Sequence, residues 1–297
     1  MTASLEETAV SYKELADLED NFSEIEKGII RQHYLRSKPL YSKRAELVAK
    51  IPNFWPLVFK QAPMDIDEYI QPSDSALLLH SLRSLSVTRF ELDEDEQKGD
   101  PRSVAIRFEF AENEHFEDKV LEKKFWWRQS KDGFAGLVSE PVEIAWKKSK
   151  DLTNGLLSLV KAVYNEQQTK VARNVALTAL KKKIEGTDIS GVSFFAWFGY
   201  VGKHVSAEES KRVIEEEEER RRRAADEEAA GNGDEDNNTA EDYAYAQDED
   251  LEIFPGGDAI AMVIVNHLWP DAIKYYFTSI SEGSLSDFGL DSGEDEN

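Results

Sequence analysis

The chain has 297 residues, 40% of them hydrophobic, which is enough for one large or two modest domains with a buried core. It contains no cysteine, so disulfides and thiolate metal sites are excluded. Its 59 acidic and 36 basic residues give a net charge of -23, and the acidic excess is concentrated at 206–250 and 282–297, which indicates a functional use of that charge.

The N-terminus shows no basic start followed by an apolar run, as a secretory signal would. The longest apolar run, 259–265, is too short to span a bilayer. With the missing cysteines, these features predict a soluble intracellular protein.

The first predicted element is a long helix over 11–49. Its apolar residues are three or four positions apart and so share one narrow stripe: Leu15, Leu18, Phe22, Ile25 and Ile29. Such a helix is on the order of 55 Å long, more than a domain of this chain can cover alone. The simplest partner is a second copy, antiparallel or parallel, so the stripe predicts a homodimer seam.

Pro39 interrupts the helical pattern, and we expect a kink or a short break there. The helix should stop at Ile51, because the residue before Pro52 is disfavoured in the helical region. Phe54 and Trp55 then enter a globular body.

A short helix with a connector is predicted at 57–70, and a second helix at 73–82 with Ser73 or Asp74 as its cap. Alternating apolar residues then predict four antiparallel strands, at 84–91, 103–110, 120–129 and 140–146. A long acidic loop covers 93–101 between the first two strands. Strands in this order form a meander with one face packed.

The turn between the last two strands is placed at Asp132-Gly133. Helices are predicted at 158–170 and 173–184, and the aromatic block at 194–198 is expected to be buried. The segment 208–230 predicts a surface helix with no apolar face and four Glu to Arg pairs at i,i+4, which either projects into solvent or is partly disordered.

Residues 231–247 are predicted to be disordered, followed by an apolar helix at 258–267 and aromatic residues at 275–277 that close the folded body. The chain is thus divided into three parts: a dimerisation helix at 1–51, a folded domain at 52–281 that contains a charged insert at 206–250, and a disordered acidic tail at 282–297.

Four motifs, in order along the chain, resemble the nucleosome assembly protein family of histone chaperones: K-R-A-E-L-V-A-K-I-P-N-F-W at 43–55, F-E-D-K-V-L-E-K-K-F at 116–125, S-F-F-A-W-F at 193–198 and L-W-P-D-A-I-K-Y-Y at 268–276. Within the family they look most like the SET (template-activating factor I) branch. The segment E-I-F-P-G-G-D-A-I-A at 252–261 is similar to the fungal member of that branch that partners a histone acetyltransferase.

The resemblance implies an α+β fold: a long dimerisation helix followed by an "earmuff" domain, in which helices back a four-stranded antiparallel sheet. It also implies a homodimer with a concave acidic surface that binds core histones, without catalysis or cofactor. The tail of this chain is shorter than the family's acidic tails are, and the charged insert carries an arginine block.

Carboxylates could bind a histone by competing with DNA for its Lys and Arg side chains. We select candidate histone-binding residues by charge and position: Asp93, Glu94, Asp95, Glu96, Glu112, Glu114, Glu117, Asp118, Glu208, Glu209, Asp248, Glu249 and Asp250. Taken alone, acidic runs more often serve solubility, and only the family motifs favour the binding interpretation.

Other candidate sites are weaker. The block 220–223 could bind nucleic acid, but the flanking glutamates favour pairing within the helix, and 181–183 could aid nuclear import or suit a helix end. The five histidines have no metal-ligand spacing, and two stretches that look like calcium loops lack the required Gly and Glu. No phosphate-loop, dinucleotide or nucleophile-elbow motif occurs.

The sequence therefore predicts a nuclear, dimeric, ATP-independent histone chaperone that promotes nucleosome assembly and presents histones to an acetyltransferase, with possible shuttling to the cytoplasm. Neither an enzyme, a cofactor, a membrane nor specific nucleic-acid binding is expected. Two alternatives remain: a regulatory inhibitor or adaptor of a phosphatase or another chromatin enzyme, and an acidic coiled-coil tether without a specific client.

Overall fold

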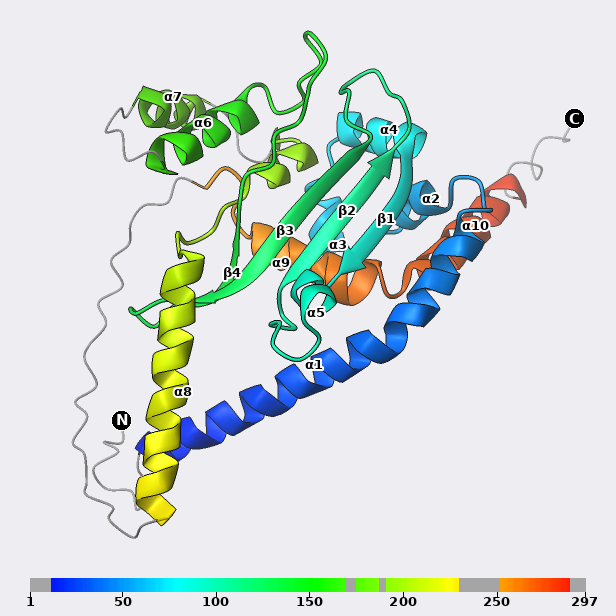
Figure 1. The fold of residues 1–297 in the computed structure, drawn as a ribbon. Coiled ribbons are helices and arrows are strands. Elements are labelled where there is room, and N and C mark those ends of the chain that lie inside the picture. The colour runs from blue at the N-terminus through cyan, green and yellow to red at the C-terminus, as the bar shows by residue number, and fades with distance from the viewer. Residues whose placement is uncertain (1–11, 169–174, 187–190, 230–251, 289–297) are drawn as a thin grey trace, which may run out of the picture. The chain divides into compact units, whose positions relative to one another are not determined.

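The computed structural model describes residues 12–168, 175–186, 191–229 and 252–288 of the chain (Figure 1). The contacts divide the chain into two compact units. The first comprises Met1–Pro52 and Thr88–Val104, and the second comprises Asn53–Val87 and Ala105–Asn297. The long helix and one inter-strand segment thus form one unit, and the sheet with its helices forms the other.

The first unit is built on helix α1, Tyr12–Val48. α1 continues through Pro39, so of the kink or short break that the sequence predicted, the break is not present. Proline removes one backbone hydrogen bond, and the helical turns on both sides carry the helix across that gap. The last helical hydrogen bond joins Ala49 N to Ala45 O at 3.0 Å, so the helix ends just before Pro52 as expected.

The rest of the first unit is the segment that links the first two strands. It begins with the short helix α5, Phe90–Glu94, where the sequence predicted the end of a strand and a loop. Further along, the chain makes a tight approach to α5, because a Cβ atom at Gly99 would lie 2.1 Å from the carbonyl oxygen of Glu91. Only glycine fits that position without a shift of the backbone.

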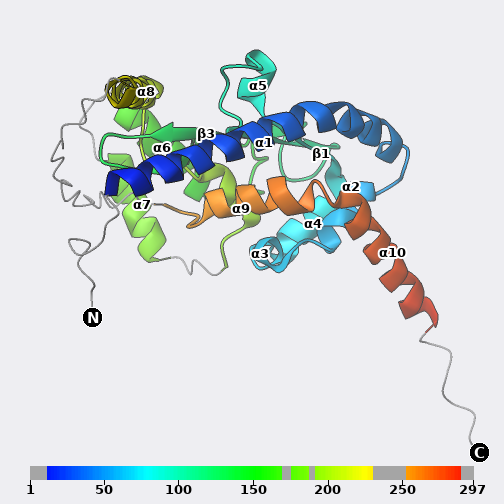
Figure 2. The same ribbon diagram turned by 90° about the horizontal axis from the view of Figure 1, so that it is seen from below.

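The second unit contains a four-stranded antiparallel meander in the order β1-β2-β3-β4, as predicted. Its strands are β1, Leu82–Thr88; β2, Val104–Phe110; β3, Val120–Gln129; and β4, Ala135–Ser139. Helices cover one face of this sheet, and Figures 1 and 2 both place α3, α4 and α9 on that side.

The predicted fourth strand at 140–146 is wrong. Gly133 has a φ of 81° in the predicted turn, and β4 pairs immediately afterwards, with Ala135 opposite Gln129 and Ser139 opposite Phe125. Pro141 has no amide hydrogen for a ladder, so pairing ends before it. The following residues make one isolated bridge, between Trp146 and Phe116.

Three helices precede the sheet in the second unit: α2, Phe54–Lys60; α3, Met64–Asp67; and α4, Pro72–Ser81. The predicted cap of α4 at Ser73 or Asp74 is wrong, because Gln71 is the N-cap and Pro72 takes the first helical position. Asp74, at the third helical position, instead accepts a hydrogen bond from the amide of Gln71 at 3.0 Å.

The other helices of the second unit follow the sheet: α6, Leu156–Gln168; α7, Val175–Glu185; the 3-10 helix η3, Phe194–Gly199; α8, Ala207–Ala229; α9, Gly257–Val263; its π-helical continuation η4, Ile264–Leu268; and α10, Ala272–Phe288. The aromatic block of η3 is fully buried, as predicted. Its rings surround Phe108 of β2, whose centroid lies 5.8 to 6.2 Å from those of Phe194, Trp197 and Phe198.

Two predictions for the charged and C-terminal segments are corrected. α8 does have a docked side, because Val213 and Ser210 are buried and the amide of Gln129 donates to Ser210 Oγ at 3.0 Å. α10 was not predicted, and it reaches Phe288, beyond the expected start of the acidic tail at 282. The segments 231–247 and 289–297 lie outside the described residues.

Two residues with ionisable side chains are completely buried among the described residues, Asp74 and Lys123. Lys123 of β3 donates its three ammonium hydrogens to the carbonyl oxygens of Glu140, Phe198 and Tyr200, at 2.8, 3.0 and 2.5 Å. Burial lowers the pKa of Lys123 well below its ordinary value, and the charges of Glu252 and Glu140 oppose that shift. Lys123 therefore joins β3 to two loops that do not pair with it in the sheet.

Candidate functional site

The candidate acidic residues at 93–96 lie in the first unit and divide into two kinds. Asp93 accepts hydrogen bonds from the Tyr34 hydroxyl at 2.9 and 3.0 Å and pairs with Lys38 Nζ at 2.6 Å. Asp95 accepts the amides of the next turn, and these hydrogen bonds lower its pKa. All four residues of this group are exposed, and Asp93 and Asp95 differ from Glu94 and Glu96 in that their carboxylates accept these hydrogen bonds.

α1 holds this acidic segment in place through main-chain contacts. The Arg31 guanidinium donates to the carbonyl oxygens of Gln97 and Gly99 at 2.6 and 2.8 Å. Arg89 donates to the carbonyl oxygen of Pro101 within the segment itself. The exposed carboxylates are thus carried by a segment whose backbone is fixed on a helix.

The second group of candidates lies on the loop between β2 and β3. Asn113 shapes the loop by accepting the amides of His115 and Phe116 at 2.8 and 3.0 Å. Asp118 accepts the amide of Ala145 at 2.7 Å, so it is a structural contact. Glu112 is exposed.

The other two carboxylates of this loop face lysines from the segment after β4. Glu114 lies 3.2 Å from Lys150 Nζ, and Glu117 lies 3.9 Å from Lys147 Nζ. The side chains of Glu114 and Glu117 are 84% and 71% exposed. Such surface pairs contribute about 0–1 kcal/mol, so a basic partner can replace the lysine at little cost.

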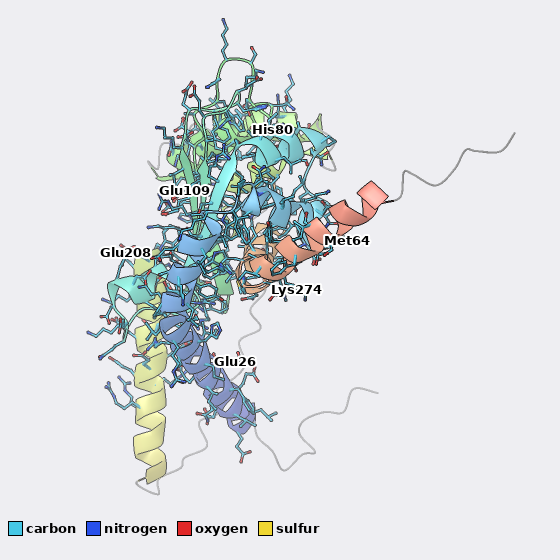
Figure 3. All side chains as sticks on the ribbon, turned by 90° about the vertical axis from the view of Figure 1, so that its right-hand side faces the viewer. Glu26, Met64, His80, Glu109, Glu208 and Lys274 are labelled. Carbon is cyan, nitrogen blue, oxygen red and sulfur yellow. The ribbon has the colours of Figure 1, made fainter. Side chains whose placement is uncertain are left out.

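The third group lies at the start of α8. Glu208 is exposed and projects from the first helical turn, where the helix dipole favours a negative charge (Figure 3). Glu209 is partly buried, and its amide donates to Ser206 Oγ at 3.1 Å, which caps the helix. The candidates Asp248, Glu249 and Asp250 lie outside the described residues.

Further along α8, the structure exposes Glu216, Glu218 and Glu219, which the sequence prediction treated only as members of helix-stabilising pairs, and Glu215, which it did not single out. One of the predicted pairs is present, with Arg223 Nη2 3.2 Å from Glu219 Oε2. These glutamates lie on the faces of α8 away from its docked side, on which Gln129 contacts Ser210 and Glu217.

The solvent-facing side of the sheet carries charges of both signs. Arg107 pairs with Glu109 at 3.1 Å on β2, and Lys124 pairs with Glu122 at 3.9 Å on β3. Figure 3 labels Glu109 on this side. Neighbouring charges of opposite sign cancel at a distance, so this face alone does not produce an acidic field.

The candidate dimerisation residues share one exposed face of α1, with exposed fractions of 48% at Leu15, rising to 61% at Ile29. Leu40 and Leu47, 69% and 54% exposed, extend this face toward the helix end. Arg31 and Tyr34 of α1 contact the acidic segment. At 3.6 residues per turn, they lie on the side of the helix opposite the apolar stripe. The apolar stripe is therefore left open within the first unit.

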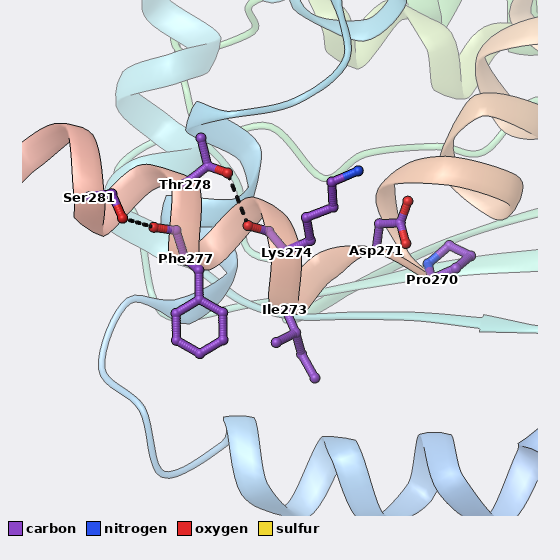
Figure 4. Close-up of a pocket in the computed structure, with 7 residues that line it drawn as sticks. All are labelled: Pro270, Asp271, Ile273, Lys274, Phe277, Thr278 and Ser281. Carbon is purple, nitrogen blue, oxygen red and sulfur yellow. Dashed lines mark hydrogen bonds between the residues drawn. The ribbon is translucent and has the colours of Figure 1, made fainter.

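The described ranges offer few features that could bind a metal ion or a small molecule. Across them, no group of three or more His, Asp or Glu side chains could hold a metal ion. None of the helices in those ranges is long and apolar enough to cross a membrane. A shallow groove of about 710 Å³ lies along α10, and Figure 4 shows the residues that line it.

Comparison with known proteins identifies the family. The nucleosome assembly protein (NAP) family matches residues 48–279. Protein SET of Drosophila melanogaster is 33% identical over 157 residues, which is 52% of this chain and 55% of that protein. Vacuolar protein sorting-associated protein 75 of Saccharomyces cerevisiae is 29% identical over 151 residues, which is 50% of this chain and 56% of that protein. The matched part thus spans about half the length of these curated relatives.

Solved structures agree on the fold. The Vps75 histone chaperone aligns with a TM-score of 0.54 and 22% identity, over 91% of this chain and 98% of that one. Ccp1 aligns with a TM-score of 0.54 and 21% identity, over 96% and 98%. The fold described above, a long helix followed by a helix-backed antiparallel sheet, is similar to the folds of both. The chain belongs to the nucleosome assembly protein family.

Proposed function

We propose that the chain is a histone chaperone that binds core histones through exposed carboxylates and promotes nucleosome assembly. The observation that carries this proposal is the family match over 48–279, which covers most of the folded second unit. The Vps75 structure is described as that of a histone chaperone, which supports the same function at the level of the fold.

The arrangement of the carboxylates suits a reversible basic client. Glu94, Glu96, Glu112 and Glu114 are exposed, and the carboxylate of Glu114 is held only by a surface ion pair. Each contact with a histone Lys or Arg would be weak, so affinity requires many of them together. Binding should therefore weaken as salt screens the charges, and the client can be released to DNA.

We further propose that the chain acts as an antiparallel homodimer along α1. The stripe from Leu15 to Ile29 is too exposed for a lone chain in water, which supports a partner helix. Charge selects the direction: 12–29 carries six acidic and two basic residues, whereas 30–48 carries five basic and one acidic. Antiparallel pairing places acidic halves on basic halves, and parallel pairing would oppose like charges.

Presentation of histones to an acetyltransferase and action in the nucleus belong to the same proposal. The resemblance of 252–261 to the acetyltransferase-partnering member of the family motivates the first, and membership of the nucleosome assembly protein family supports the second. Lys181, Lys182 and Lys183 are exposed at the end of α7, where an import receptor could reach them.

Sedimentation of the full chain with each purified histone pair tests the proposal. At about physiological salt we expect a complex whose affinity falls as salt is raised. If the chain and both histone pairs sediment separately under those conditions, the chain is not a histone chaperone.

A further inference from the structure

Two of the candidate histone-binding carboxylates are paired with lysines of their own chain. Glu114 Oε2 lies 3.2 Å from Lys150 Nζ, and Glu117 Oε1 lies 3.9 Å from Lys147 Nζ. A histone offers the same chemistry, a positively charged group at the end of a long, flexible side chain. The two lysines and the side chains of a histone would therefore compete for the same carboxylate oxygens.

The backbone around the lysines fixes them beside these carboxylates. The amide of Lys147 donates to the carbonyl oxygen of His115 at 2.7 Å, and Lys147 Nζ donates to the carbonyl oxygen of Asn113 at 2.7 Å. The ring of Trp146 packs edge-on against Phe116, with their centroids 5.6 Å apart. Because the two segments are joined in this way, the lysines are present at the carboxylates at a high effective concentration.

The pair of Lys150 with Glu114 is the one that a client can open most easily. The side chains of Lys150 and Glu114 are 44% and 84% exposed, so the carboxylate can be reached from solvent. Lys147 is held more firmly, since its ammonium group also bonds to the main chain of the loop. A histone side chain therefore gains Glu114 once Lys150 has moved into water.

We infer that Lys147 and Lys150 are internal competitors of the basic client, which occupy Glu117 and Glu114 in the free chain and are displaced when a histone binds. This inference rests on the proposed function, since it takes these carboxylates to be histone contacts. Each displacement subtracts the strength of one surface ion pair from the contact that replaces it. The displaced lysines stay tethered beside the carboxylates and retake them, which favours release of the client to DNA.

The test compares the parent with Lys150→Gln, which keeps a polar side chain and removes its charge. The position is exposed, so the fold should survive, and circular dichroism checks that it does. We expect the Kd for purified core histones to fall about two- to threefold at low salt, and the ratio of parent to variant to approach one as salt is raised. Lys150→Arg keeps the charge and should leave Kd within about 1.5-fold of the parent.

Removal of any lysine makes the chain more negative, so the matched control makes the same change of charge elsewhere. Lys131→Gln, at the exposed lysine just after β3, should lower Kd by less than about 1.5-fold. A double-mutant cycle then isolates the pair. On the Glu114→Gln background, where the lysine has no carboxylate to mask, Lys150→Gln should leave Kd unchanged.

The outcomes separate this inference from the proposed function. An unchanged Kd in Lys150→Gln, or a fall that is as large on the Glu114→Gln background as in the parent, overturns the inference and leaves the proposed function intact. A rise in Kd of more than about twofold would make Lys150 a contact of the client, which also overturns it. Failure of the parent itself to bind histones overturns both the proposed function and this inference.

Discussion

Tyr34 of α1 donates its phenolic hydrogen to Asp93 of α5, with its oxygen 2.9 and 3.0 Å from the two carboxylate oxygens. Lys38 completes the arrangement, with its Nζ 2.6 Å from the same carboxylate. Burial, and then the hydrogen bond to Asp93, raises the pKa of Tyr34 to about 12, so the hydroxyl remains a donor at neutral pH. Asp93 was chosen from the sequence as a histone contact, but its carboxylate is bound by Tyr34 and Lys38 of its own chain.

Tyr34→Phe should therefore affect stability rather than binding. Removing a hydrogen bond to a carboxylate that is still paired with Lys38 should lower the free energy of unfolding by about 1 kcal/mol. Histone affinity should stay within about twofold. Urea unfolding measures the stability, and titration with histones measures the affinity. Glu94→Gln, at an exposed neighbour, should instead lower the affinity and leave the stability unchanged. A large affinity loss in Tyr34→Phe would return Asp93 to the binding surface.

Elements whose apolar residues recur at a regular spacing were predictable from the sequence, because that spacing differs between strands and helices. β3 begins at Val120 and ends at Gln129 as expected, and the aromatic block at 194–198 is buried. β4 was misplaced because apolar residues also occur at 140–146, and only Pro141 and the turn at Gly133 select the earlier pairing.

Site residues were harder to predict, since charge says nothing about which partner a carboxylate meets. Asp93 and Asp118 accept hydrogen bonds from segments distant in sequence, and Asp95 accepts those of the following turn. The docked side of α8 was missed because Val213 stands among charged residues and the neighbouring contact is the hydroxyl of Ser210, which carries no apolar signal.

Dimerisation can be tested at the centre of the stripe. Leu18→Glu with Ile25→Glu would place unpaired charges inside a paired seam and should yield monomers or unfolded protein. Light scattering of the purified variant measures the mass. Leu79→Glu, a charge at an exposed apolar site on α4, is the control and should leave the dimer intact. A double variant that keeps the parent's mass would place the interface elsewhere.

The antiparallel direction makes a separate prediction. In an antiparallel pair centred near Arg31, the midpoint of the apolar face from Leu15 to Leu47, Leu15 of one copy lies beside Leu47 of the other, because their distances from the centre match. The double variant Leu15→Cys/Leu47→Cys should then form a disulfide-linked dimer on mild oxidation. The chain has no other cysteine to interfere. Cross-linking of Leu15→Cys alone, which brings two identical positions together, would instead indicate parallel helices.

Glu252 gives a pH-dependent prediction. Burial raises its pKa from the ordinary 4.5, although hydrogen bonds from the amides of Val201, Phe254 and Gly202 oppose the shift. Folding therefore favours the protonated carboxyl, so its stabilising contribution is complete below pH 4.5 and is lost as the pH rises through the raised pKa.

The side-chain amide of Glu252→Gln does not ionise, so the variant should not lose this stabilising contribution as the pH rises. The free energy of unfolding of the variant, relative to the parent, should increase from about pH 4 to about pH 8. Urea unfolding at several pH values measures it, with Glu114→Gln, at an 84% exposed side chain, as the flat control. A pH-independent difference for Glu252→Gln would show that the carboxyl titrates normally in the folded chain.

Lys123 should be the most costly single charge to remove. Lys123→Met keeps the length of the side chain but leaves the carbonyl oxygens of Glu140, Phe198 and Tyr200 without their donor in a buried setting. It also leaves the partly buried Glu252 without its nearby positive charge. Truncating one member of a buried charged group costs about 3–5 kcal/mol, so we expect a loss of that size in urea unfolding.

The control for this change is Lys131→Met, at an exposed lysine just after β3, which should alter stability by less than about 0.5 kcal/mol. Lys123→Arg should also destabilise, because a planar guanidinium cannot direct its donors to three carbonyl oxygens set around one ammonium. If Lys123→Met lost less than about 1 kcal/mol, water or another donor would have to satisfy these carbonyls, and the ammonium would not be what joins β3 to the loops at Glu140 and Tyr200.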